Sequence, residues 1–170
     1  SAIRHRLTIE QLTAGNSPLF FVSVTQIMNE SRSFYLLSLG CPKNLVDSEG
    51  IATLLRRAGY APAPNPDAAD LLIVNTCGFI ESARAESREV LRELAQTRRS
   101  DQKIIAAGCY SQRCPNELIE AIPSIDGLIG TRRWMDIVDL VDHLGGEAGH
   151  RQSGNPVCHV PDVETMGQDT

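Results

Sequence analysis

The chain has 170 residues, which is enough for one domain with a hydrophobic core. Hydrophobic residues make up 42% of it and charged residues 22%, a balance typical of a globular protein and not of a disordered one. The net charge of −5 argues against strong nucleic-acid binding through the whole surface. No apolar run approaches the roughly 18 residues of a membrane-spanning helix.

The first part of the chain differs in character from the remainder. We expect residues 1–33 to form a weakly ordered extension. Met28 stands shortly before the first regular strand, so one interpretation is that the native chain begins there. The alternative is an additional edge strand at residues 19–24.

From residue 34 the sequence alternates between apolar runs and amphipathic segments. Strands are predicted at residues 34–39, 60–64, 71–74, 103–107 and 125–129, of which 60–64 is rich in proline and suits a sheet edge. Helices are predicted after Cys41 as far as Gly59, at 81–98, from Pro115, and from Thr131 to Gly145. This alternation predicts an α/β fold, a three-layer flavodoxin-like domain over residues 34–145. Its mostly parallel, five-stranded sheet should have the strand order 2-1-3-4-5. Residues 146–170 show no periodicity and are expected to be a linker or tail.

The five cysteines, at positions 41, 77, 109, 114 and 158, are too widely spaced for a small disulfide scaffold. We therefore expect a reduced, cytoplasmic protein whose thiols serve metal or redox chemistry. Three of the cysteines, Cys41, Cys77 and Cys109, stand beside a glycine where a predicted strand ends. Sites in open parallel sheets lie outside the carboxyl ends of the strands, and these three strands are neighbours in the predicted order. One such cysteine would be a small buried hydrophobe, but three at equivalent positions predict a shared site.

Three thiolates suit a soft metal centre. Cysteine thiolates hold iron–sulfur clusters, and a cubane with only three protein ligands keeps one iron open. Zinc is the alternative, because Cys114 or a histidine is available as its fourth ligand. Helix N-termini after the loops, and Lys43 close to Cys41, favour the thiolate form.

Residues 39–49 (LGCPKNLVDSE), 75–80 (NTCGFI) and 108–113 (GCYSQR) together resemble the N-terminal domain of radical AdoMet methylthiotransferases. The resemblance implies an auxiliary [4Fe–4S] cluster held by Cys41, Cys77 and Cys109, whose open iron carries the sulfur to be inserted. Residues 42–49 resemble the branch that methylthiolates the β-carbon of an aspartate in ribosomal protein uS12. The tRNA-modifying branch is the alternative.

In this family a second [4Fe–4S] cluster and AdoMet bind a separate radical domain. The present sequence contains no Cys-x-x-x-Cys-x-x-Cys triplet, so that domain is expected to be a partner beyond the tail. We therefore expect this chain to bind a cluster but not to complete methylthiolation alone. Cys114, Cys158, His150 and His159 are not expected to be ligands.

Several polar residues near the three cysteines are candidates for supporting roles. Asn44, Asp47, Ser48 and Glu49 are candidates for a second layer around the cluster or for an interface, with helix capping as the simpler explanation. Asn75 and Thr76 are candidates for positioning the second loop, and Gln112 and Arg113 for facing the partner domain or substrate.

Two other classes of protein share the predicted fold. The first is a flavodoxin-like module that binds FMN or a protein without catalysis. It is disfavoured because Cys-Pro-Lys-Asn stands where a Ser- and Thr-rich phosphate loop would follow the first strand. The second is a structural zinc or thiol-redox domain.

Overall fold

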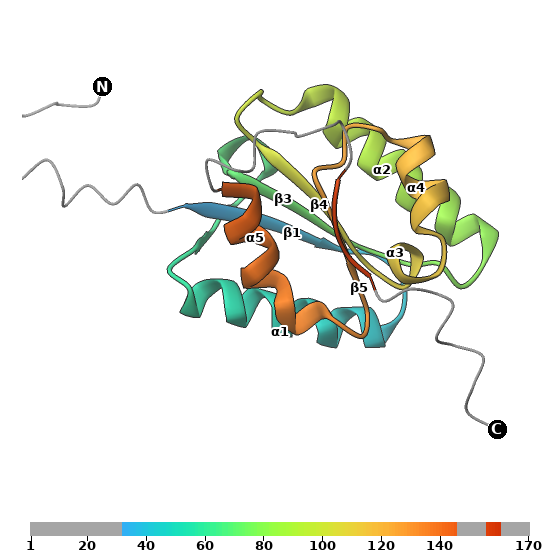
Figure 1. Cartoon of the computed structure of the whole chain (residues 1–170), viewed down its shortest axis with the longest axis horizontal. Helices are drawn as coiled ribbons and strands as arrows, with labels where there is room; N and C mark the ends of the chain where they lie inside the picture. The colour runs from blue at the N-terminus through green and yellow to red at the C-terminus, as the bar shows by residue number, and fades with distance from the viewer. Residues whose placement is uncertain (1–31, 146–155, 161–170) are drawn as a thin grey trace, which may run out of the picture. The chain divides into compact units, whose positions relative to one another are not determined.

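The computed structural model describes residues 32–145 and 156–160, which form a parallel sheet with helices on both faces (Figure 1). The strands lie in the order β2-β1-β3-β4-β5-β6, and all neighbours are parallel. Their bounds are β1 (Ser33–Ser38), β2 (Ala61–Pro62), β3 (Leu71–Thr76), β4 (Lys103–Gly108), β5 (Gly127–Gly130) and β6 (Val157–His159). The α/β class and the order of the first five strands are confirmed.

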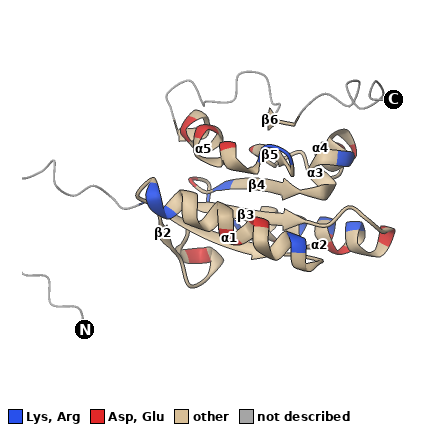
Figure 2. Cartoon of the chain, turned by 90° about the horizontal axis from the view of Figure 1, so that it is seen from below, with Lys and Arg blue, Asp and Glu red and all other residues tan. Residues whose placement is uncertain are grey.

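The helices are divided between the two faces of the sheet. Helices α1 (Pro42–Arg57) and α5 (Ile137–Gly145) pack on one face, and α2 (Glu81–Thr97), α3 (Cys109–Arg113) and α4 (Pro115–Ala121) pack on the other. Two short 3-10 helices, η3 (Pro66–Ala68) and η4 (Trp134–Asp136), lie in connections. Charged side chains lie mostly on the helices, and the central strands are almost free of them (Figure 2).

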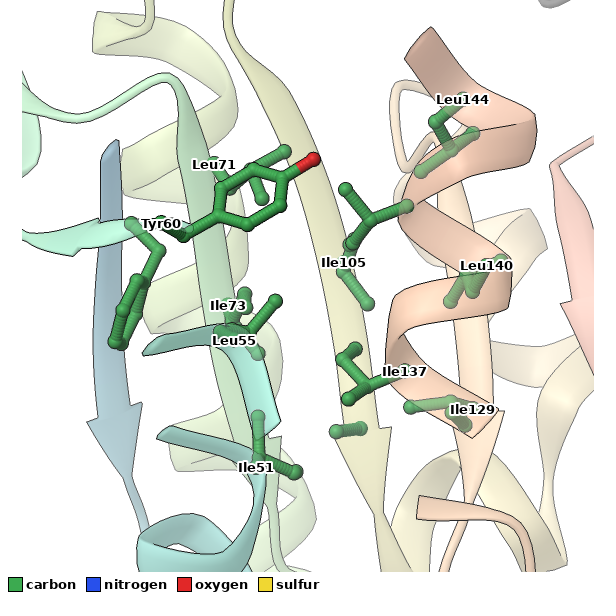
Figure 3. Packing of buried hydrophobic residues seen from close by; sticks show 13 residues of the cluster. Ile51, Leu55, Tyr60, Leu71, Ile73, Ile105, Ile129, Ile137, Leu140 and Leu144 are labelled. Atoms are coloured by element: carbon green, nitrogen blue, oxygen red, sulfur yellow. The ribbon is translucent and has the colours of Figure 1, made fainter. Parts of the chain in front are cut away.

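Alternation along the central strands divides the core into two layers. In β3, Leu71 and Ile73 face α1 and α5, whereas Leu72 and Val74 face the opposite helices. Figure 3 shows the first layer, in which the side chains of α1 and α5 point toward the strands. All six residues of β3 are buried, as expected for a central parallel strand covered on both faces.

The structure differs from the predicted elements at three places. The prediction of five strands is wrong by one, because β6 adds Val157–His159 from the segment expected to be a linker, in register with Gly127–Ile129 of β5. Thr131 caps no helix; η4 precedes α5 instead, with Arg133 at its N-cap position. Cys109 and the four residues after it form α3, where a loop was predicted.

Some expectations lie outside the described residues. These are the weak order of residues 1–31, the edge strand at 19–24, the start at Met28, and most of the tail at 146–155 and 161–170. Within the part that is described, no helix is long and apolar enough to cross a membrane.

Candidate metal centre

Cys41, Cys77 and Cys109 follow three neighbouring strands at the same edge of the sheet. Cys77 comes directly after β3 and Cys109 directly after β4, while Cys41 follows β1 by three residues and stands at the N-cap of α1. The strand registers align Ser38 with Asn75 and Asn75 with Ala107, so the three strands end together. Cys77 is buried, Cys109 is half-buried and Cys41 is exposed.

The glycines beside these cysteines bring the three loops into direct contact. A Cβ on Gly40 would lie 2.7 Å from Cys77 Cβ and 3.0 Å from its Sγ. A Cβ on Gly78 would lie 2.7 Å from the Cα of Tyr110 and 3.1 Å from the carbonyl carbon of Cys109. The first and second loops therefore each lie against the cysteine segment of the next, at a distance that admits only glycine.

Gly108 completes this interlocked arrangement from the third strand. Its φ of 97° lies in a region that residues with a side chain rarely adopt. A Cβ at this position would also overlap Asn75 Oδ1 and lie 2.5 Å from the carbonyl oxygen of Thr76. The backbone of β4 can therefore approach β3 immediately before Cys109 only because residue 108 is glycine.

Buried amide side chains connect the loops across the strands. Asn44 Nδ2 donates to the carbonyl oxygens of Leu39 at 2.7 Å and Thr76 at 3.2 Å. Asn75 Nδ2 donates to the carbonyl oxygen of Asn44 at 2.8 Å and to Ser48 Oγ at 2.9 Å. The expectation that Asn75 helps to hold the second loop agrees with these bonds. Capping does not explain Asn44, because the bonds of its side chain leave helix α1.

Two hydroxyl groups fix the backbone around Cys77. Thr76 Oγ1 donates to the carbonyl oxygen of Ala107 at 2.5 Å. Ser87 Oγ accepts from the Cys77 N–H at 3.3 Å and donates to the Cys77 carbonyl oxygen at 3.4 Å. Sequence reasoning placed Ser87 on the inward face of its helix but missed this contact. The available signal was a serine within an otherwise apolar helical stripe.

The environments of Cys41 and Cys109 shift their thiol pKa values in opposite directions. The backbone N–H groups of Asn44 and Lys43, at the start of α1, lower the pKa of the Cys41 thiol. Burial raises the pKa of the Cys109 thiol, and the positive charge of Lys43 opposes that rise. Lys43 itself is paired with Asp47 at 2.6 Å. The exposed thiol is therefore the one more readily ionised.

The donor chemistry of these residues is that of an iron–sulfur site, but their side chains are not gathered as a bound metal requires. Three thiols are the ligand type that such clusters take, and they lie at one edge of the sheet beside glycines that admit close approach. In this geometry, residues 32–145 and 156–160 contain no group of three His, Cys, Asp or Glu side chains gathered closely enough to hold a metal ion. The side chain of Cys41 makes no capping hydrogen bond on α1.

The two remaining cysteines lie elsewhere. Cys114 joins α3 to α4 and packs against the core on that face, where Arg84 Nη1 of α2 contacts its Sγ at 3.9 Å. Cys158 is exposed on β6, and the neighbouring His159 faces the ring of His143 at 6.0 Å between centroids. His150 lies outside the described residues.

The other polar candidates are arranged in different ways. The buried Gln112 has an Oε1 without a hydrogen-bond partner among the described residues, and it lies where a Cβ on Gly130 would be. The guanidinium of Arg113 lies 5.9 Å from the ring centroid of the exposed Phe79, which follows Cys77 by two residues. Glu49 is exposed on α1. Gln112 thus packs against the carboxyl end of β5, whereas Arg113 lies beside the exposed ring of Phe79.

Comparison with known proteins places this domain in a family. The family described as Uncharacterized protein family UPF0004 matches residues 33–130. The protein named Ribosomal protein uS12 methylthiotransferase RimO from Roseiflexus sp. (strain RS-1) is 46% identical over 114 residues, which are 67% of this chain and 24% of that protein. Proteins of the same name from Chloroflexus aurantiacus and Desulforamulus reducens are 42% and 50% identical, over 81% and 69% of this chain and 30% and 27% of their own lengths.

The chain thus spans less than a third of the length of these relatives. The matched residues 33–130 include the three cysteines and the strands β1, β3 and β4 that position them. The chain therefore belongs to Uncharacterized protein family UPF0004, and its resemblance to the N-terminal domain of methylthiotransferases of the uS12 branch is confirmed.

Proposed function

We propose that this chain is the auxiliary-cluster domain of a methylthiotransferase that acts on the β-carbon of an aspartate in ribosomal protein uS12. The observation that carries this proposal is the meeting of the three interlocked loops that bear Cys41, Cys77 and Cys109. The names of the relatives, which are uS12 methylthiotransferases, support the choice of substrate. They favour the ribosomal branch over the tRNA-modifying one.

Cys41, Cys77 and Cys109 would hold a [4Fe–4S] cluster through their thiolates. When bound, a cluster with three protein ligands supplies an open iron that can carry the sulfur to be transferred. The chain's own contribution is to ionise and orient these ligands. The start of α1 favours the thiolate of Cys41, and the packed loops hold the backbones of Cys77 and Cys109.

The remaining parts of the reaction belong to partners of this domain. The relatives are more than three times longer than the segment they share with this chain, and we propose that a radical AdoMet domain lies in that remainder. That domain would bind AdoMet and the second [4Fe–4S] cluster in the cytoplasm. The cluster domain would begin at Ser33, where β1 starts one residue before the predicted boundary, and extend to residue 145, with β6 completing its sheet. The rest of residues 146–170 would lead to the radical domain. The residues before Ser33 would be an extension.

Anaerobic reconstitution with ferrous iron and sulfide tests the proposal. We expect about four irons and four sulfides per chain. Cys41→Ala should lose the cluster without loss of fold, because its side chain is exposed and makes no capping bond. Cys158→Ala removes another exposed cysteine, from β6, and is the control that should keep the cluster.

A second pair of variants tests the buried ligand. Cys77→Ala should lose the cluster, whereas Cys114→Ala should retain it, because Cys114 packs against the core at the junction of α3 and α4 and contacts Arg84 instead. Recovery of zinc or of flavin absorbance from the reconstituted wild type would contradict the proposal. Methylthiolation of uS12 by this chain alone, with AdoMet and a reductant, would contradict the assignment of the radical step to another domain.

A further inference from the structure

The side chain of Asn44 contacts all three cysteine-bearing segments at once. Its Nδ2 donates to the carbonyl oxygen of Leu39, in the loop that leads to Cys41, and to that of Thr76, next to Cys77. Its Oδ1 accepts from the Sγ of Cys109 at 3.7 Å. Asn44 is 0% exposed, so its own amide group is shielded from solvent.

A local role in helix α1 does not account for this arrangement. The N-cap of α1 is Cys41, and Asn44 lies within the first turn. The partners of its side chain, Leu39, Thr76 and Cys109, all lie outside the helix. A buried amide is costly unless it is hydrogen-bonded, so these contacts restrict the side chain to one orientation.

Neighbouring groups hold Asn44 in place. Its backbone N–H donates to the carbonyl oxygen of Cys41 at 2.9 Å, and its own carbonyl oxygen accepts from Asn75 Nδ2 at 2.8 Å. Asn75 is itself buried, and its Nδ2 also donates to Ser48 Oγ. Asn44 is thus fixed from the backbone of the first loop and from the end of β3.

We propose that Asn44 is a positioning residue that sets the direction of the Cys109 Sγ relative to Cys41 and Cys77. This inference rests on the proposed function, because it concerns the ligands of the proposed cluster. In the metal-free chain this hydrogen bond orients the Cys109 thiol. A metal-bound thiolate has no proton to donate, so Asn44 acts by placing the ligand before the cluster binds. Of the three thiols, the Cys109 thiol is the one that this side chain contacts, so Cys109 is the ligand whose orientation should depend on Asn44.

The test compares Asn44→Ala with Ser48→Ala. Both residues are buried and polar and lie four positions apart on α1, but Ser48 bonds to Asn75 and not to a cysteine. In the metal-free chain, Asn44→Ala should raise the rate of Cys109 alkylation several-fold, with Cys158 as the internal reference, while Ser48→Ala leaves it unchanged. After reconstitution, Asn44→Ala should bind the cluster about 10-fold more weakly and change the electron paramagnetic resonance spectrum of the reduced protein.

Each outcome of this test decides one question. If the wild type takes up no iron, the proposed function is overturned. The alkylation rates still test the positioning role in that case, because they are measured without metal. Equal Cys109 alkylation rates and equal spectra in Asn44→Ala and Ser48→Ala overturn the positioning role alone. If Asn44→Ala does not fold, Asn44→Ser replaces it, because a hydroxyl keeps one donor but is too short to reach Cys109. It should show the same rise in alkylation, and an unchanged rate would refute the role.

Discussion

The two ends of the parallel sheet are fastened by different chemistry. At the amino ends of the strands, charged groups connect the segments: Asp70 Oδ2 accepts from the N–H of Ser33 at 2.7 Å, and the buried Asp126 pairs with Arg98. At the carboxyl ends, the neutral amides of Asn44 and Asn75 and the glycines perform the same task.

Because of this difference, the charged groups that stabilise the sheet lie at the end away from the three thiols. A buried carboxylate at the carboxyl end would compete with thiolates for a metal or for a cation, whereas a neutral amide fastens the loops without adding charge. The ion pair of Asp126 and Arg98 lies at the amino ends of the strands, away from the thiolates, and does not compete with them. The comparison indicates that the charge at the carboxyl end is left to the cysteines and to the Lys43–Asp47 ion pair, while neutral amides hold the loops.

Substitution of the glycines should have the largest effect. We expect Gly108→Ala to lower the free energy of unfolding by about 4 kcal/mol, because it combines an unfavourable φ with overlap at Asn75 and Thr76. Gly78→Ala, which meets the backbone of Tyr110 and Cys109 without an unfavourable φ, should cost about 2 kcal/mol. Gly59→Ala is the control for φ alone: its φ is 91°, nothing lies within 4 Å, and about 1 kcal/mol is expected.

Urea unfolding of the metal-free variants measures this series. If Gly59→Ala destabilised the chain as much as Gly108→Ala, close packing at the carboxyl end would contribute nothing. The glycines would then no longer distinguish the carboxyl ends of the strands from the amino ends.

Loss of the buried carboxylate of Asp126, at the amino ends of the strands, should lower the free energy of unfolding nearly as much. Asp126→Ala leaves Arg98 without this carboxylate and removes the acceptor of the Ile104 N–H, 2.9 Å away, so we expect a loss of about 3 kcal/mol. Asp101→Ala, which removes an exposed partner of Arg99, should leave stability nearly unchanged. Alkylation rates of Cys41 and Cys109 in Asp126→Ala should match the wild type, and altered rates would show that the two ends are coupled.

A single hydroxyl at the carboxyl end should have a smaller effect. Thr76→Val retains the shape of the side chain but removes the donor to the Ala107 carbonyl oxygen, and should cost about 1 kcal/mol in thermal unfolding. Thr97→Val removes a similar bond, to the Glu93 carbonyl oxygen, from an exposed position on α2 and is expected to be nearly neutral. Equal losses in both variants would argue against a special role for the bond beside Cys77.

The smallest effect concerns pH. The folded-state pKa of Cys41 is lowered, so its thiolate adds to stability above the unfolded pKa, and this contribution is lost as the pH falls through the folded pKa. The pKa of Cys109 is raised. In the metal-free chain, iodoacetamide should therefore alkylate Cys41 at a lower pH than Cys109, as followed by mass spectrometry. Coincident pH profiles would refute the opposite shifts.

The strands and helices that show a clear pattern of hydrophobic residues were predicted correctly from the sequence. The continuous apolar runs of β3 and β4 and the amphipathic helices between them placed three cysteines at neighbouring strand ends. Strand β6 was missed because three residues are too few to show a period, and its place depends on pairing with β5. The short helix α3, which begins at Cys109, has too few turns to leave a pattern.

The contacts within the site were beyond sequence reasoning for a different reason. Asn44 is 32 residues from Thr76 and 65 residues from Cys109 along the chain, and no local pattern reports which partners such a side chain meets. The simpler expectation of a capping role came from its place in the first turn of α1. Only the folded sheet shows that its bonds lead to the neighbouring loops.

The interlocked glycines have a consequence for local opening of the domain. Gly40 lies against Cys77, Gly78 against the Cys109–Tyr110 backbone, and Gly108 against the end of β3. Separation of one loop thus exposes the backbone of the next, so the segments around the three cysteines open as one cooperative unit. Their amide protons then exchange with solvent at a common free energy, although the segments are far apart in the chain. The backbones of the three cysteine segments are thus protected from solvent together, even though the Cys41 side chain is exposed.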